Sequence, residues 1–209
     1  LTEVELAALL PTFKSHHGVC AKFMLLTGAR ITETTAATWS QIDLEAMTWT
    51  IPPENLKDTR ALQARRHKPK QALAIPLSRQ AIQLLTDTRE AETERRQLNG
   101  LQEEIRKQDL LFVGPRGSKL GNWDRWLKAT TATTGITGWS AHALRRTTAT
   151  LAGDLGAPPH IVSVILGHSN VGGQLVAGYN QSTYSSEHQQ ILQRVADKLE
   201  EMEGSVKYE

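Results

Sequence analysis

Apolar residues recur three and four positions apart along most of the chain, the spacing that places them on one face of an α-helix. The first such segment also shows a capping-box pattern, because Thr2 can cap a helix whose Glu5 reaches back to it. In a later segment Leu144, Thr148, Leu151 and Leu155 form one buried stripe. The pattern predicts helices over residues 1–10, 18–28, 31–39, 79–108 (broken at 99–100), 122–135, 140–156, 158–166 and 185–203.

Two short runs in the first half of the chain lack this helical period. The runs "MTWTIPP" (47–53) and "ALAIPLS" (72–78) are β-like, and a polar stretch separates them. We expect them to form a hairpin or small sheet with a long connection. The predicted fold class is therefore mainly α with a small antiparallel β-sheet (α+β), in one domain.

The long connection between these runs concentrates positive charge. The chain of 209 residues has a net charge of only +2, yet residues 56–70 hold six Lys and Arg against one acidic residue. A local basic cluster on a near-neutral chain favours a surface that binds a polyanion such as nucleic acid. The alternative is a solvated loop. The six cations are Lys57, Arg60, Arg65, Arg66, Lys68 and Lys70.

The overall composition excludes several classes of protein. With 39% hydrophobic and 22% charged residues, the chain resembles an ordinary soluble globular protein. No apolar stretch approaches the ~18 residues of a membrane span, and no signal peptide opens the chain. The single cysteine, Cys20, excludes an internal disulfide and fits a reducing cytoplasm. Because the chain begins at Leu1, we expect it to be a piece of a longer protein.

The helix predicted over residues 140–156 carries polar side chains among small and aliphatic ones. His142 and Arg145 share a face away from the buried stripe, and Arg146 lies on the other side of His142. A guanidinium fork binds phosphate oxygens, and a nearby imidazole exchanges protons near neutral pH. The group therefore predicts phosphate binding or phosphoryl chemistry, and helical geometry leaves the choice between Arg145 and Arg146 open. A helix-turn-helix DNA reader is disfavoured, because the second helix lacks an exposed polar face.

Several short motifs, in order along the chain, resemble the catalytic domain of the tyrosine recombinase, or phage integrase, family. Each motif is weak alone, but their order and spacing make the resemblance specific, and together they span nearly the whole chain. The motifs are "LTEVELAALL" (1–10), "TGARITE" (27–33), "ALAIPLS" (72–78), "HALRRT" (142–147), "LGH" (166–168) and "VAGYNQ" (176–181).

The resemblance implies a set of catalytic positions. Its spacing selects Arg145, rather than Arg146, as the arginine of the His-x-x-Arg pair that begins at His142. The implied catalytic residues are Arg30, Lys57, His142, Arg145, His168 and Tyr179, and Glu33 is the acidic residue that supports the site. Residues Arg60, Arg65, Arg66, Lys68 and Lys70 are expected to contact DNA.

The chain departs from the family pattern at two places. The segment between the two β-like runs is longer than in many relatives, so Lys68 or Lys70 could replace Lys57 as the active lysine. The distance from the late histidine to Tyr179 is also slightly long, which leaves Tyr184 as the alternative nucleophile.

The chemistry that the resemblance implies is DNA strand exchange without a metal or any other cofactor. The tyrosine attacks a backbone phosphate, forms a 3′-phosphotyrosyl link and releases a 5′-hydroxyl. Arg30 and Arg145 would stabilise the charge on the phosphate, and His142 would assist proton removal. His168 would donate a hydrogen bond to the phosphate, and Lys57 would protonate the leaving oxygen. DNA binding should weaken steeply with added salt, because the basic stretch would contact the backbone.

The resemblance also implies a domain organisation and partners. We expect a catalytic domain over residues 1–184, and a C-terminal helix with an acidic tail over 185–209, packing on its own domain or on a neighbouring protomer. The DNA-binding domain that normally precedes this one is absent from the chain. The expected partners are double-stranded DNA, further copies forming a tetramer on that DNA, and accessory DNA-bending proteins, with no membrane. The expected location is the bacterial cytoplasm, on the nucleoid when bound.

Two other functions compete with site-specific recombination. A type IB topoisomerase uses similar chemistry but relaxes DNA without exchanging partners, and the compact "HALRRT…LGH…Y" arrangement disfavours it. A non-catalytic DNA-binding module could use the same basic surface, but binding alone does not need the complete set of catalytic residues.

Overall fold

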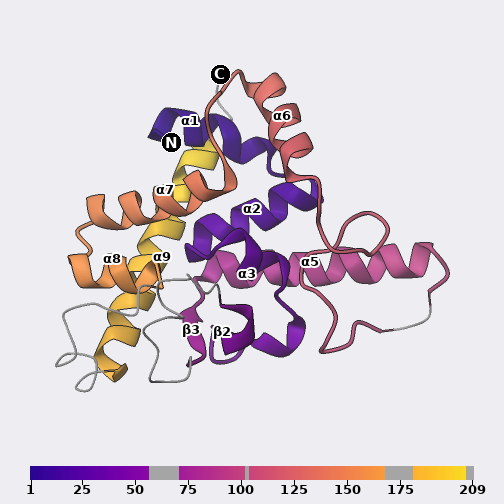
Figure 1. Cartoon of the computed structure of the whole chain (residues 1–209), viewed down its shortest axis with the longest axis horizontal. Helices are drawn as coiled ribbons and strands as arrows, with labels where there is room; N and C mark the ends of the chain where they lie inside the picture. The colour runs from indigo at the N-terminus through magenta and orange to yellow at the C-terminus, as the bar shows by residue number, and fades with distance from the viewer. Residues whose placement is uncertain (57–70, 102–103, 168–180, 206–209) are drawn as a thin grey trace, which may run out of the picture.

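The computed structural model describes residues 1–56, 71–101, 104–167 and 181–205, with the side chains of the last range from residue 186 onward. The helices are α1 (Glu3–Leu9), α2 (His16–Thr27), α3 (Ile31–Thr35), α5 (Arg79–Leu98), α6 (Trp123–Thr134), α7 (Ala141–Asp154), α8 (Pro159–Ile165) and α9 (Gln181–Ser205). The strands are β1 (Ile42–Asp43), β2 (Thr48–Ile51) and β3 (Leu73–Pro76). This architecture confirms the predicted fold class. The small sheet and α6 lie at opposite ends of the helical body (Figure 1).

The ends of the helices follow the polar residues that the sequence places there. The Thr2 hydroxyl accepts a hydrogen bond from the Glu5 amide at 3.2 Å, and the Glu5 carboxylate accepts one from the Thr2 amide at 2.8 Å. This reciprocal pair confirms the predicted capping box. At the other end of the next helix, Gly28 adopts the left-handed conformation, with φ of 66°, and ends α2 where the sequence predicts.

The core forms around α2. Eight of its twelve residues are buried, and α5, α7 and α9 pack against it. A helix that is apolar on all sides needs partners on all sides, which explains its central place. The Phe23 ring links this helix to the sheet and to the chain beyond α5, because it lies 5.3 Å from the rings of both Trp49 and Phe112, centroid to centroid.

The sheet has three antiparallel strands in the order β1-β2-β3. Trp49 pairs with Ile75 in the register between β2 and β3, and Ile51 pairs with Leu73. Trp49 and Ile51 face the core while Thr50 between them is exposed, which is the alternation expected of a strand covered on one face. The two predicted β-like runs are therefore confirmed as paired strands. The two-residue β1 is an addition that the sequence did not predict.

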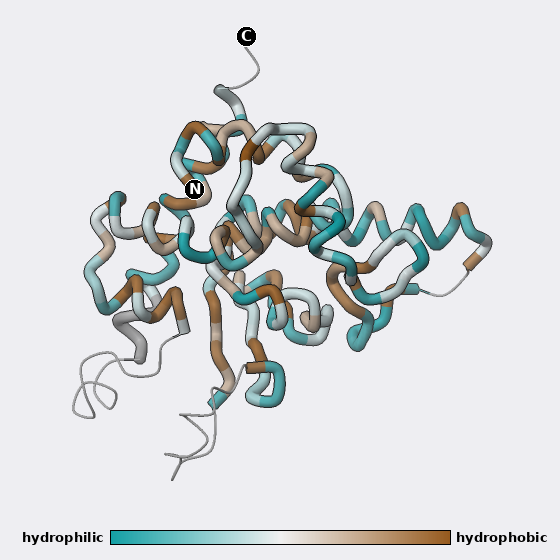
Figure 2. Tube along the Cα trace, turned by 45° about the horizontal axis from the view of Figure 1, so that its top comes forward, coloured by the Kyte–Doolittle hydropathy of each residue, from teal (hydrophilic) through white to brown (hydrophobic). Residues whose placement is uncertain are grey.

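Helix α5 extends beyond the rest of the molecule, and its outer part is mostly hydrophilic (Figures 1 and 2). Ser78 caps its first turn and the helix ends at Leu98, as the break at Asn99–Gly100 predicts. The segment after the break does not continue the helix, contrary to its helical composition. Asp109 in this segment accepts a hydrogen bond from Arg96 at 2.8 Å. The chain therefore turns back after α5, and this return segment packs against the helix.

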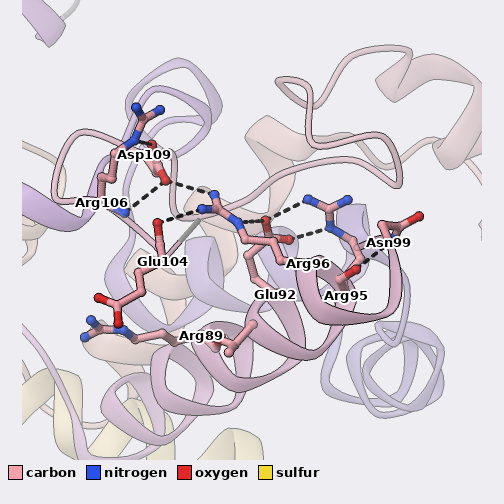
Figure 3. Close-up of polar contacts among 9 residues, drawn as sticks. Arg89, Glu92, Arg95, Arg96, Asn99, Glu104, Arg106 and Asp109 are labelled. Carbon is pink, nitrogen blue, oxygen red and sulfur yellow. Dashed lines mark hydrogen bonds and ion pairs between the residues drawn. The ribbon is translucent and has the colours of Figure 1, made fainter. Parts of the chain in front are cut away.

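An ionic cluster accounts for this attachment (Figure 3). The buried Glu92 carboxylate binds Arg95 at 2.6 Å and Arg96 at 2.8 Å. Hydrogen bonds from Arg95, ahead of those from Arg96, lower the pKa of Glu92. Arg106 also binds Asp109, at 3.3 Å. Because five charged side chains share one network, polar contacts hold the return segment against α5.

The C-terminal helix α9 packs on its own chain. It begins at Gln181 and contacts α1, α5, α7 and α8. In Figure 1 it runs from the end of the molecule that holds the sheet to the end that holds α1. The docking of this helix on a neighbouring protomer stays a prediction. None of the helices in the described part of the chain is both long enough and apolar enough to cross a membrane. The apolar stripe that is buried comprises Ile191, Leu192, Val195, Leu199 and Met202.

His188 in α9 makes the stability of the fold depend on pH. Its side chain is 3% exposed, and its Nε2 has no hydrogen-bond partner among the described residues. Burial lowers the pKa of His188 from 6.5 to about 4. The neutral ring is therefore favoured in the folded state, whereas the unfolded chain takes up the proton at a higher pH. The contribution is complete above pH 6.5 and is lost as the pH falls towards 4.

We expect the free energy of unfolding to fall by about 3 kcal/mol over this window on account of His188. The His188→Leu variant should lose this part of the pH dependence, because leucine does not titrate. Urea denaturation at pH 7 and pH 4.5 measures both proteins, and the exposed His16→Leu serves as the control. The same pH dependence in wild type and His188→Leu would contradict the assignment.

Candidate active site

Three segments that are distant in the sequence meet at one point of the structure. Arg30 directly precedes α3, Arg145 lies in the first turns of α7, and Leu166 follows α8. Arg30 Nη2 donates to the Leu166 carbonyl at 3.5 Å, and Arg145 Nη2 donates to the same carbonyl. The two arginines that the sequence predicts for the site are thus brought side by side.

Arg145 is the buried member of this pair. Its side chain is 4% exposed, and its Nη1 donates to the carbonyl of Gly28. These two bonds use two of the five N–H groups of the guanidinium. Burial, followed by repulsion from Arg30, lowers the pKa of Arg145 to about 10, while Glu33 raises it. The group therefore keeps its positive charge at neutral pH.

Burial of Arg145 differs from the expectation for its helix face. The apolar stripe holds as predicted at Leu144, Thr148 and Leu151, which are all buried, whereas Leu155 at the end of the helix is only half-buried. Arg145 was expected on a separate face, together with His142. The structure buries it because the end of α2 and the end of α8 also lie against α7, so that a wider part of the α7 surface is covered. His142 and Arg146 are exposed on the same helix.

Glu33 is buried beneath Arg30. It is 1% exposed, and its carboxylate accepts hydrogen bonds from the Arg30 amide at 2.9 Å and from Arg30 Nη1 at 2.8 Å. One side chain thus caps the short helix α3 and also orients the guanidinium. The pair is the i,i+3 contact that the sequence allows, but because Glu33 is buried, removing one partner costs more than breaking a surface ion pair.

The Glu33→Gln variant is expected to lose about 1–3 kcal/mol of stability, because it replaces a buried charged acceptor by an amide that faces the Arg30 guanidinium. We also expect slower DNA cleavage, since Arg30 loses its orientation. Chemical denaturation and a cleavage assay measure the two effects. Glu5→Gln is the matched control, because Glu5 makes the same backbone contact in α1, far from the arginines. Equal effects of the two substitutions on cleavage would contradict the role of Glu33.

Most of the other predicted site residues lie outside the described residues. These are Lys57, Arg60, Arg65, Arg66, Lys68, Lys70, His168 and Tyr179. The side chain of the alternative nucleophile, Tyr184, is also outside the described part. Their assignments stay predictions.

Two described residues that are close in sequence to these segments lie together near Arg30. Gly167 directly precedes His168, and Leu73 begins the strand that follows the basic stretch. A Cβ atom built on Gly167 would lie 3.4 Å from Leu73 Cδ2 and 3.7 Å from Arg30 Nη1. The chain therefore continues from the neighbourhood of Arg30 into both segments that carry the remaining candidates.

The two main-chain acceptors of the site were not predicted. The Gly28 and Leu166 carbonyls hold the guanidinium groups, but every residue has a carbonyl, so residue identity carries no signal for them. A weak signal was the glycine at the end of each helix, Gly28 after α2 and Gly167 after α8, both in the left-handed conformation. Such a glycine marks a helix end, where the last carbonyls have no partner within the helix and can accept from other groups.

Comparisons with known proteins identify the family and the fold of the chain. The sequence profile of the phage integrase family matches residues 1–186. Comparison with curated proteins gives no match. The solved structure of XerA recombinase has a TM-score of 0.58 at 18% identity, over 100% of this chain and 65% of that one. The Tn1549 transposon integrase, in complex with transposon right end DNA, has a TM-score of 0.61 at 21% identity, over 94% of this chain and 65% of that one.

These structures establish a shared fold, and the chain spans about 65% of their length. The family profile covers both arginines and every motif that the sequence analysis singled out. On this evidence the chain belongs to the phage integrase family.

Proposed function

We propose that this chain is the catalytic domain of a site-specific recombinase that integrates or excises a mobile element. It cleaves and rejoins DNA strands through a 3′-phosphotyrosyl intermediate. The observation that carries this proposal is the convergence of Arg30 and Arg145 on the Leu166 carbonyl. Two guanidinium groups held together by a shared main-chain acceptor form a preorganised site for one phosphate, which is the substrate group of strand cleavage.

In the proposed reaction the Tyr179 oxygen attacks the phosphorus of the scissile phosphate. The bond from phosphorus to the 5′-oxygen breaks as the tyrosine–phosphorus bond forms. His142 assists removal of the tyrosine proton, and Lys57 protonates the leaving 5′-oxygen. A 5′-hydroxyl from another strand then attacks the phosphotyrosine and reverses the steps. The bond energy stays in the covalent link, so the reaction needs no nucleotide.

Arg30 and Arg145 stabilise the negative charge that develops on the phosphate during this reaction. Negative charge builds on the non-bridging phosphate oxygens as the tyrosine attacks, and the two guanidinium groups stabilise it. They keep a fixed orientation throughout because Glu33, Gly28 and Leu166 already hold them. His168 would add a hydrogen bond to the same phosphate.

The proposed partner is double-stranded DNA, with the basic stretch 56–70 on its backbone. The structurally similar Tn1549 integrase was solved in complex with DNA, which supports DNA as the partner. We further propose that four copies assemble on the DNA, aided by accessory DNA-bending proteins, in the bacterial cytoplasm on the nucleoid.

A nicked duplex that carries the element's own attachment site tests the proposal. Cleavage beside the nick releases a short fragment, so the covalent product cannot be rejoined and accumulates. We expect the full-length protein to form an adduct that survives a denaturing gel, with a chelator present and no ATP. Peptide mapping by mass spectrometry should find the DNA on Tyr179. Absence of an adduct would contradict strand cleavage. If the protein forms the adduct, and in a separate assay relaxes supercoiled DNA without giving recombinant products, it would be a topoisomerase.

A further inference from the structure

Gly28 occupies a place where no side chain fits. It ends α2 with φ of 66°, two residues before Arg30, and its carbonyl accepts a hydrogen bond from Arg145. A Cβ atom built on it would lie 2.8 Å from Ile165 Cγ2 and 3.4 Å from Thr148 Cγ2. The first distance is shorter than real Cβ contacts allow, so a side chain here would displace Ile165.

Helix α7 cannot give way to relieve this contact. The Thr148 side chain is fully buried, and its hydroxyl donates to the Leu25 carbonyl at 2.9 Å. This hydrogen bond fastens α7 to α2 one turn beyond Arg145. The end of α8 is consequently the element that would have to move.

Ile165 is the last residue of α8, and the Leu166 carbonyl follows it. That carbonyl accepts hydrogen bonds from both Arg30 and Arg145. A shift of Ile165 would therefore displace the acceptor that the two arginines share. The absence of a side chain at Gly28 therefore lets Ile165 take the position that places the acceptor of both guanidinium groups.

We infer that Gly28 and Ile165 are positioning residues for strand cleavage: their close contact sets the end of α8, and so the carbonyl that aligns the two arginines on the scissile phosphate. This inference rests on the proposed function. Neither residue touches the phosphate, so the contact should affect the rate of cleavage far more than the affinity for DNA.

The Gly28→Ala variant tests this inference in the full-length protein. We expect adduct formation at saturating DNA to slow about 100-fold, because a misplaced catalytic group loses that much through a shift of an ångström. The Kd for DNA should stay close to that of wild type. Gly135→Ala is the matched control, since Gly135 ends α6 with φ of 73° and has nothing within 4 Å of a built Cβ. It carries the same backbone strain without the contact.

A second substitution separates positioning from loss of folding. Ile165→Leu keeps the volume of the side chain but removes the Cγ2 atom that meets the built Cβ. The double variant Gly28→Ala with Ile165→Leu should recover most of the lost rate. If Gly28→Ala does not fold, Ile165→Ala breaks the contact from the other side. It should slow cleavage more than Ile161→Ala, which removes an equally buried isoleucine from the same helix.

The outcomes are distinct. Cleavage by Gly28→Ala at the rate of Gly135→Ala, or a double variant that gains nothing, overturns the inference while the proposed function stands. Equal rates for the two isoleucine variants also overturn it. A wild-type protein that forms no adduct overturns the proposed function, and the inference with it.

Discussion

Tyr179→Phe is expected to abolish covalent adduct formation completely while DNA binding remains. Phenylalanine lacks the hydroxyl oxygen that attacks phosphorus, so no compensating group can form the bond. The measurement is the nicked-duplex assay, with the Kd for the same DNA determined beside it. Because the loss removes the nucleophile itself, this substitution has the largest expected effect.

Tyr184→Phe is the control for this prediction. Position 184 lies within α9, and its tyrosine is the alternative nucleophile that the spacing of the motifs leaves open. We expect this variant to form the adduct at the wild-type rate. Adduct formation that survives in Tyr179→Phe and disappears in Tyr184→Phe would move the nucleophile into the helix and keep the reaction class.

Arg145→Lys is expected to slow cleavage about 1,000-fold, the range found when a preorganised donor to a developing charge is removed. A lysine nitrogen cannot donate to the Gly28 and Leu166 carbonyls and also reach the phosphate in the planar geometry of a guanidinium. Burial already lowers the pKa of Arg145 to about 10. A lysine begins from a lower pKa, so the same burial would bring its pKa closer to neutral pH.

Arg146→Lys is the matched control for that substitution. Arg146 is the next residue on α7 and is exposed, so its replacement should change neither the folding nor the rate of adduct formation. Rates at saturating DNA for the two variants decide between the neighbouring arginines. A large loss in Arg146→Lys with an active Arg145→Lys would reverse the assignment.

The parts of the fold that could be predicted are those where a regular spacing of apolar residues ends at a residue that caps or breaks the element. The run that contains Trp49 and Ile51 alternates in burial and was correctly expected to be a strand. The helix that starts after Ser78 and stops at Asn99 was also expected. By contrast, β1 has only two residues, which is too short for any period to be visible. The non-helical return segment depends on Arg96 reaching Asp109, a contact that helical composition does not report.

The site divides along a similar line. Arg30 and Arg145 were expected together because the resemblance links two distant motifs, and the structure joins them. The burial of Arg145 could not be predicted from α7 alone, since it depends on the ends of α2 and α8 covering that side of the helix. The acceptor carbonyls of Gly28 and Leu166 belong to the backbone and have no residue type to mark them. The sequence shows that position 28 has no side chain, but it does not show that Ile165 packs there and requires this.

The place of α9 has a consequence for how the protein is made. Ile191 through Met202 complete a core that also contains α1, near the other end of the chain. Contacts between residues so far apart in sequence cannot form while the later residues are still untranslated, and they slow folding because a long loop must close first. A nascent chain would therefore expose the apolar faces of α2 and α7 until synthesis has passed Met202. Since the same two helices position the arginines, competence to bind a phosphate would be acquired only after translation of this domain is finished.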